Sequence, residues 1–136
     1  MRALIDTCVV VDALQSRKPF GENAEKILLL SAIKAYEGFI TAKSVADIYY
    51  LLHKATHSDE ESRQLLGKLF TLFSVLDTPG RACVNALASP IGDYEDALMG
   101  ETARLSEIDC IVTRNKQDYR KSRLKILAPE EFIAMF

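Results

Sequence analysis

The feature that most constrains this chain is a regular alternation of short apolar runs with longer segments of helical hydrophobic periodicity. Five runs resemble strands, at residues 2–6, 38–42, 74–77, 109–113 and 125–128. Strands that alternate with helices form a mainly parallel sheet, because each return to the same edge requires a helical crossover. The sequence therefore predicts an α/β fold, a three-layer α/β/α sandwich around a mainly parallel sheet.

The segments between these runs carry their apolar residues on one face. Residues 24–35 and 45–55 show the spacing that is typical of amphipathic helices. Ser58 begins a capping box ahead of the next apolar stripe. Thr78 followed by Pro79 predicts the N-cap and the first position of a further helix. Both faces of the sheet should therefore be covered by helices.

A chain of 136 residues is within the size range of one domain, and no linker or repeat divides it. We predict a single domain over residues 1–136. The longest uncharged stretch, residues 82–92, is too short and too polar to span a membrane. The first residues lack the apolar region of a signal peptide, and we expect a cytoplasmic protein. Cys8, Cys83 and Cys110 have apolar neighbours, which is typical of reduced core cysteines.

Acidic residues recur where the predicted strands end. Asp6 closes the first run, and Asp47 lies in the helix after the second. Asp96 lies at the start of a later helix, and Asp118 follows the fourth run. In a parallel sheet these positions share one edge, where crowded carboxylates repel one another unless a cation neutralises them. Oxygen ligands without His or Cys suit Mg²⁺ or Mn²⁺, so the pattern indicates metal-assisted hydrolysis of a phosphodiester.

Each of these acids also has a plainer interpretation. Asp6 is placed to cap the helix that follows it, because aspartate is a favoured N-cap residue. Asp93 is placed to cap the later helix, with Asp96 as its capping-box partner. Asp47 fits a solvated helical position, and Asp118 fits a turn. The joint pattern favours a metal site more than any single residue does.

Four segments taken together resemble the successive motifs of PIN domains, most closely those of small bacterial VapC-type ribonuclease toxins. The segments are LIDT with a following apolar turn and Asp12, AKSVADIYYLL, DYEDAL and IVTRNKQDY, at residues 4–7, 42–52, 93–98 and 111–119. The resemblance covers nearly the whole chain. It implies a PIN-like three-layer fold and an endoribonuclease site that depends on Mg²⁺ or Mn²⁺.

The resemblance also assigns roles to individual residues. It implies that Asp6, Asp96 and Asp118 bind the metal and that Asp47 is a further catalytic acid. The family usually has glutamate at the position of Asp47, so the shorter side chain favours a water-bridged contact with the metal. Supporting roles fall to Thr113, which would orient a water or a ligand by a hydrogen bond, to Asn115, which would assist Asp118, and to Asp93, an additional acid near the edge.

The charge distribution indicates where RNA would bind. The net charge is -2, from 17 basic and 19 acidic residues, so total charge does not attract a polyanion. Residues 114–125, however, contain six basic residues and one acid. Such residues hold phosphates without reading the base sequence, whereas the plainer alternative is a solubilising turn. The predicted RNA-binding residues are Arg114, Lys116, Arg120 and Lys121.

The leading prediction is thus an Mg²⁺- or Mn²⁺-dependent ribonuclease, the toxin of a toxin–antitoxin pair. Its expected partners are an RNA substrate, a small antitoxin protein and a second copy of the chain. A different hypothesis is a catalytically degenerate PIN fold that binds RNA or protein, motivated by Asp47. A third is phosphoryl transfer through Asp6 as nucleophile, although Cys8 stands where such enzymes have a second aspartate.

Overall fold

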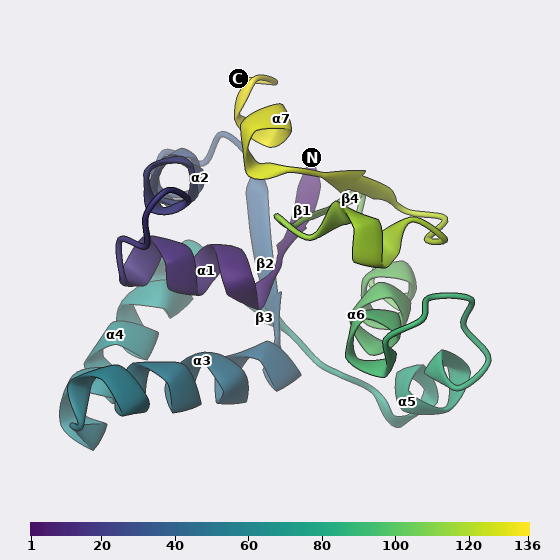
Figure 1. Cartoon of the computed structure of the whole chain (residues 1–136), viewed down its shortest axis with the longest axis horizontal. Helices are drawn as coiled ribbons and strands as arrows, with labels where there is room; N and C mark the ends of the chain where they lie inside the picture. The colour runs from purple at the N-terminus through teal and green to yellow at the C-terminus, as the bar shows by residue number, and fades with distance from the viewer.

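All five apolar runs form strands in the computed structural model, which describes residues 1–136 (Figure 1). The strands are β1 (Arg2–Ile5), β2 (Glu37–Thr41), β3 (Ser74–Leu76), β4 (Cys110–Val112) and β5 (Lys125–Leu127). They form one parallel sheet in the order β3-β2-β1-β4-β5. Leu4 of β1 pairs with Phe39 of β2 and with Ile111 of β4, so β1 lies at the centre. The predicted parallel sheet is confirmed.

Seven α-helices and one short 3₁₀ helix connect the strands. They are α1 (Thr7–Leu14), α2 (Gly21–Ala32), α3 (Ala42–Thr56), α4 (Asp59–Leu72), α5 (Gly80–Ala86), α6 (Tyr94–Leu105), η1 (Lys116–Tyr119) and α7 (Pro129–Ile133). Figure 1 shows α5 and α6 on one side of the sheet and α1 to α4 on the other, which confirms the three-layer α/β/α sandwich. None of these helices is both long enough and apolar enough to cross a membrane.

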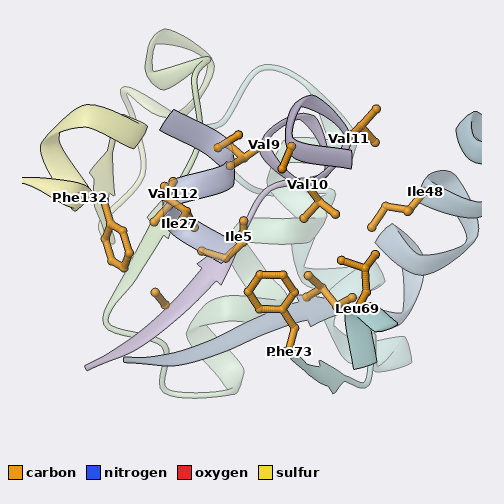
Figure 2. Close-up of a cluster of buried hydrophobic side chains, with 14 of the residues drawn as sticks. Ile5, Val9, Val10, Val11, Ile27, Ile48, Leu69, Phe73, Val112 and Phe132 are labelled. Atoms are coloured by element: carbon orange, nitrogen blue, oxygen red, sulfur yellow. The ribbon is translucent and has the colours of Figure 1, made fainter. Parts of the chain in front are cut away.

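The core lies on both faces of the sheet because successive residues of a strand point in opposite directions. Ile5 packs in one cluster with side chains of α1, α2, α3, α4 and α7. Leu4 packs in a second cluster with side chains of α5 and α6. Figure 2 shows the first cluster, in which Ile5 is surrounded by Val9, Ile27 and Phe73. Both central faces are therefore dry, and polar chemistry is confined to the ends of the strands.

Two helix starts near the sheet test the capping predictions. The side chain of Ser58 accepts a hydrogen bond from the backbone amide of Glu61 at 3.1 Å, so α4 begins as predicted. The capping box itself is only half formed, because the backbone amide of Ser58 donates to Thr56 Oγ1 and not to the Glu61 side chain. The prediction for α5 is wrong by one residue. Pro79, at φ -73° and ψ 151°, is extended and precedes the helix, which begins at Gly80. Thr78 therefore does not cap α5, and its side chain lies at the strand ends instead.

Candidate functional site

A cavity of about 260 Å³ lies at the carboxyl edge of the sheet, where β1, β2 and β3 end. Four acids line it: Asp6, Asp47, Glu95 and Asp96. The remaining lining residues are Thr7, Thr41, Lys43, Ser44, Thr78, Leu98, Met99 and Thr102. The structure thus brings three of the predicted acids together and adds Glu95, which the sequence analysis missed. This edge is where open parallel sheets bind their ligands.

Asp6 stands at the N-cap position of α1, yet its side chain makes no capping hydrogen bond. The capping interpretation is therefore corrected. One carboxylate oxygen, Oδ2, accepts a hydrogen bond from Thr113 Oγ1 at 2.7 Å and another from Cys8 Sγ at 3.4 Å. Burial and the charge of Asp6 raise the pKa of Cys8 to about 11, so the thiol stays protonated and able to donate. The buried hydroxyl of Thr113 therefore orients Asp6. The same hydroxyl accepts a hydrogen bond from the backbone amide of Asn115.

Asp93 and Asp96 divide two roles at the start of α6. The Asp93 carboxylate accepts hydrogen bonds from the backbone amides of Glu95 and Asp96 at 2.9 and 3.1 Å, so its predicted capping role is confirmed. Asp96 does not reach back to Asp93 as a capping-box partner would. Its carboxylate lines the cavity instead. Because Asp93 satisfies the helix end, Asp96 is left available for another partner.

The electrostatics of Asp96 show that the acids act on one another. Burial raises the pKa of Asp96, and the neighbouring hydroxyl of Tyr119 opposes that rise. Three nearby carboxylates raise the pKa further, those of Asp93, Asp6 and Asp118. Like charges held together in a partly desolvated place favour either protonation or the binding of a cation. The raised pKa of Asp96 therefore reflects its burial first and the neighbouring negative charges second.

Asp47 lines the same cavity but already has a cationic partner. Lys43 Nζ lies 2.6 Å from Asp47 Oδ2 and 3.3 Å from Glu95 Oε1. Burial lowers the pKa of Lys43, but its hydrogen bonds and charge interactions with the two acids outweigh this effect, and the pKa is raised overall. The Lys43 side chain therefore carries a positive charge inside the cavity at neutral pH. Lys43 and Glu95 are identified as residues of the site only by their ion pair across the cavity, and a single sequence does not reveal such a pair.

Asp118 and Asn115 lie outside this cavity. Asp118 is part of η1 and lines a neighbouring cavity of about 200 Å³ together with Asp93, Arg120 and Lys121. Asn115 precedes η1 and lines neither cavity. The charge of Asp118 nevertheless raises the pKa of Asp96, so the two cavities are electrostatically coupled. The structure thus divides the predicted acids between two adjacent cavities.

The residues of the first cavity fit a hard divalent cation by their chemistry. The donors are carboxylate and hydroxyl oxygens, and two of the hydroxyls, those of Thr78 and Thr102, are buried without a hydrogen-bond partner. Buried orphan hydroxyls indicate a polar occupant, such as water around an ion. No three acidic, His or Cys side chains converge closely enough to form a complete protein shell. Mg²⁺ commonly takes one or two carboxylates and keeps its waters, which matches Asp6 and Asp96.

The predicted RNA-binding residues are not equivalent. Arg114 Nε lies 3.1 Å from the buried carboxylate of Asp12, and its guanidinium stacks over the ring of Phe20 at 4.4 Å from the centroid. Lys116 pairs with Glu131 at 2.7 Å. By contrast, the following two basic residues, Arg120 and Lys121, are exposed and line the neighbouring cavity. These two are therefore the basic side chains most available to a phosphate next to the site.

Replacement of Asp96 by asparagine should raise the stability of the fold and weaken any binding of Mn²⁺ at this cavity. A carboxyl group whose pKa is raised by folding stabilises the fold only while protonated, so its contribution is lost as pH rises through the folded pKa. Asp96→Asn should therefore unfold at a higher temperature than the unchanged chain at pH 7 in chelator, and the difference should shrink as the pH falls towards 4. The positive end of α6 opposes this gain by about 0.3–1 kcal/mol, so we expect a rise of a few degrees.

Thermal unfolding at several pH values measures this difference, and Mn²⁺ calorimetry on the same sample measures loss of binding. A lower unfolding temperature for Asp96→Asn at pH 7 would show that the acids do not repel one another as the cavity implies.

A five-stranded parallel sheet between two helical layers, with carboxylates gathered at its carboxyl edge, defines an α/β/α protein with an acidic cavity at the strand ends. The sequence profile of the PIN domain matches residues 2–117. The chain therefore belongs to the PIN domain family, as the motif resemblance predicts. No curated protein gives a significant sequence match.

Several solved structures share the fold, among them those of VapC toxins in VapBC toxin–antitoxin complexes. VapBC2 from Rickettsia felis, bound to a promoter DNA fragment, matches with a TM-score of 0.68 and 18% identity, over 94% of this chain and 98% of that chain. A toxin–antitoxin complex from Klebsiella pneumoniae matches with a TM-score of 0.68 and 20% identity, over 93% of this chain and 97% of that chain. VapBC-1 from nontypeable Haemophilus influenzae matches with a TM-score of 0.70 and 15% identity, over 96% of this chain and 99% of that chain. These likenesses concern the fold.

Proposed function

We propose that the chain is an Mg²⁺- or Mn²⁺-dependent endoribonuclease that hydrolyses RNA phosphodiester bonds as the toxin of a toxin–antitoxin pair. The observation that carries this proposal is the convergence of Asp6 and Asp96 on one polar cavity at the carboxyl edge of the sheet. The two residues are far apart in sequence, and neither uses its carboxylate to cap its own helix. Membership of the PIN family and the likeness in fold to toxin–antitoxin complexes support the assignment.

Individual residues of this chain would perform distinct tasks. Asp6 and Asp96 hold the cation, and Thr113 keeps Asp6 in position through its 2.7 Å hydrogen bond. The cation, when bound, supplies the Lewis acid that polarises the phosphodiester and promotes the attack of water. Asp47 acts through a water-bridged contact. Asp118, assisted by Asn115, would join this set only after movement of η1, because it lines the neighbouring cavity.

The neighbouring cavity gives the RNA a place to bind. Arg120 and Lys121 are exposed there, beside the acids Asp93 and Asp118. Cationic side chains next to an acidic centre hold the phosphates on either side of the reacting one and offset the repulsion between RNA and carboxylates. Such contacts do not read the base sequence, so the target would be selected by loop shape and partner context.

A pool of RNA with random sequence tests the activity without knowledge of the natural target. The purified chain should cleave the pool in the presence of Mn²⁺ and leave it intact in EDTA, with the new 5′ ends mapped by sequencing. Calorimetry on the same preparation should detect Mn²⁺ binding. Absence of both cleavage and Mn²⁺ binding, even with RNA present, would overturn the proposal.

A second candidate function is a catalytically degenerate PIN fold that binds RNA or protein. The specific observation that favours it is the engagement of Asp47 by Lys43, together with the absence of a complete protein shell for a metal. This candidate predicts that the chain binds the RNA pool equally well with and without EDTA and cleaves none of it. The same experiment therefore separates the two functions.

We further propose that a small antitoxin and a second copy of the chain cover apolar side chains that the fold leaves exposed, in a cytoplasmic protein. Leu29 of α2 and Ile33, which directly follows α2, are 64% and 74% exposed, and Phe70 of α4 is 47% exposed. The large buried residues of the same helices, such as Ile27 and Leu69, belong to the core. Light scattering of the purified chain measures its molar mass in solution, and the mass of a monomer would contradict the proposed dimer.

A further inference from the structure

Lys43 is the only basic side chain in the cavity that the acids line. It comes from the first turn of α3, on one face of the sheet, and its Nζ contacts Asp47 of the same helix and Glu95 of α6 on the other face. No other ion pair joins α3 to α6. We propose that Lys43 is a built-in cation of the site: its single positive charge lies between Asp47 and Glu95 and offsets one of their two negative charges, so that the cavity takes one divalent ion, at Asp6 and Asp96.

The position of Lys43 is unfavourable for the helix that carries it. A cation in the first turn of a helix faces the positive end of the helix dipole. A lysine four residues before an acid is also the less favourable order for such a pair. Helix stability therefore does not explain a lysine at this position, whereas the contact with Glu95 across the cavity does.

The two helix starts that meet at Lys43 are held firmly. Thr41 caps α3 by accepting a hydrogen bond from the amide of Ser44 at 3.0 Å, and both of these side chains are buried. Asp93 caps α6 in the same way. Lys43 and Glu95 each lie two residues after these caps, so the backbone that carries both members of the ion pair is held by capping hydrogen bonds. The Lys43 side chain is 35% exposed and contacts one acid from each of the two helices, which places its positive charge at the cavity.

The consequence concerns the number of metal ions, and it rests on the proposed function. Four carboxylates line the cavity, and Lys43 contacts two of them. Asp6 and Asp96 have no basic partner, and they are the two acids that remain for a divalent ion. A second divalent ion at Asp47 and Glu95 would lie next to the ammonium and be repelled by it. The unchanged chain should therefore bind one metal ion.

Manganese titration of the intact full chain and of Lys43→Met tests this inference. Methionine keeps the apolar stem of lysine and removes its charge. We expect one Mn²⁺ per unchanged chain. In Lys43→Met we expect a second Mn²⁺ per chain and, because a nearby positive charge is gone, at least about tenfold tighter binding of the first. Lys43→Arg keeps the charge and should retain one ion. Manganese calorimetry and electron paramagnetic resonance count the ions independently of activity.

Lys26→Met is the matched control, because Lys26 also forms an ion pair with an acid four residues away, but on the exposed face of α2. It should bind Mn²⁺ as the unchanged chain does. Two ions in the unchanged chain, or identical titrations for it and Lys43→Met, would overturn the role of Lys43. Mn²⁺ binding by Lys43→Met alone would support that role while contradicting the proposed metal-dependent function. No binding by either would contradict both.

Discussion

Replacement of Asp6 by asparagine is expected to abolish Mn²⁺ binding and RNA cleavage while the chain remains folded. Asparagine has the shape of aspartate, and its side-chain oxygen can still accept the hydrogen bond from Thr113. What it loses is the charge that binds a cation. Residues that merely support metal ligands contribute 10- to 100-fold to metal affinity or activity, so loss of a ligand should cost at least about 100-fold. Calorimetry with Mn²⁺ and cleavage of the random RNA pool measure the two effects.

The matched control for this experiment is Asp77→Asn. Asp77 follows β3 at the same edge of the sheet, but it is exposed and does not line the cavity. It should bind Mn²⁺ and cleave RNA as the unchanged chain does. Circular dichroism shows whether Asp6→Asn is folded, and removal of one of four crowded carboxylates should not lower its stability. Cleavage at the unchanged rate by Asp6→Asn would contradict the proposed role of this residue.

The central strands β1, β2 and β4 could be predicted from the sequence because they are buried on both faces and read as continuous apolar runs, whereas the edge strands β3 and β5 are partly exposed. The start of α6 could also be predicted, because Asp93 is a favoured cap just ahead of a helical pattern. The start of α5 at Gly80 was harder to predict to the residue, because proline is compatible with both the first helical position and the extended residue before it. Local signals therefore located the elements, and topology then gave the edge at which acids should gather.

The inner arrangement of the site could not be predicted in the same way. Whether Asp6 caps α1 or points into the cavity depends on its hydrogen bond with Thr113, a residue more than 100 positions later in the sequence. Lys43 meets Glu95 only because α3 and α6 approach the same strand ends from opposite faces. Asp118 is placed in the neighbouring cavity by the tight 3₁₀ turn of η1, which no periodicity in the sequence announces. These features arise from contacts between distant segments.

Replacement of Arg114 by methionine is expected to destabilise the fold by about 3 kcal/mol. Its partner Asp12 is 2% exposed, and removal of one member of a buried ion pair leaves an uncompensated charge, which typically costs about 3–5 kcal/mol. The expected value lies at the low end because Arg17 remains 3.8 Å from Asp12. Chemical unfolding at pH 7 measures the loss. Lys116→Met, which breaks an exposed pair in the same segment, should cost no more than about 1 kcal/mol.

The pH dependence of this loss identifies its cause. Burial raises the pKa of Asp12, and Asp6 raises it further, whereas Arg114 and Arg17 lower it. Without Arg114 the folded pKa of Asp12 should rise further. A carboxyl group with a raised folded pKa contributes stability at low pH that is lost as pH rises through that pKa. The deficit of Arg114→Met should therefore be largest near pH 7 and shrink as the pH falls towards 4.

The double variant Asp12→Asn with Arg114→Met separates a structural role of Arg114 from an RNA contact. It removes both charges, so it should be more stable than Arg114→Met alone, because no buried carboxylate is left without its partner. Arg114 directly follows Thr113, and the ion pair fixes the start of the segment that orients Asp6. Mn²⁺ affinity should therefore fall in Arg114→Met and stay low in the double variant, which also lacks the ion pair. An Arg114→Met chain of unchanged stability with weaker RNA binding would instead make Arg114 an RNA-binding residue.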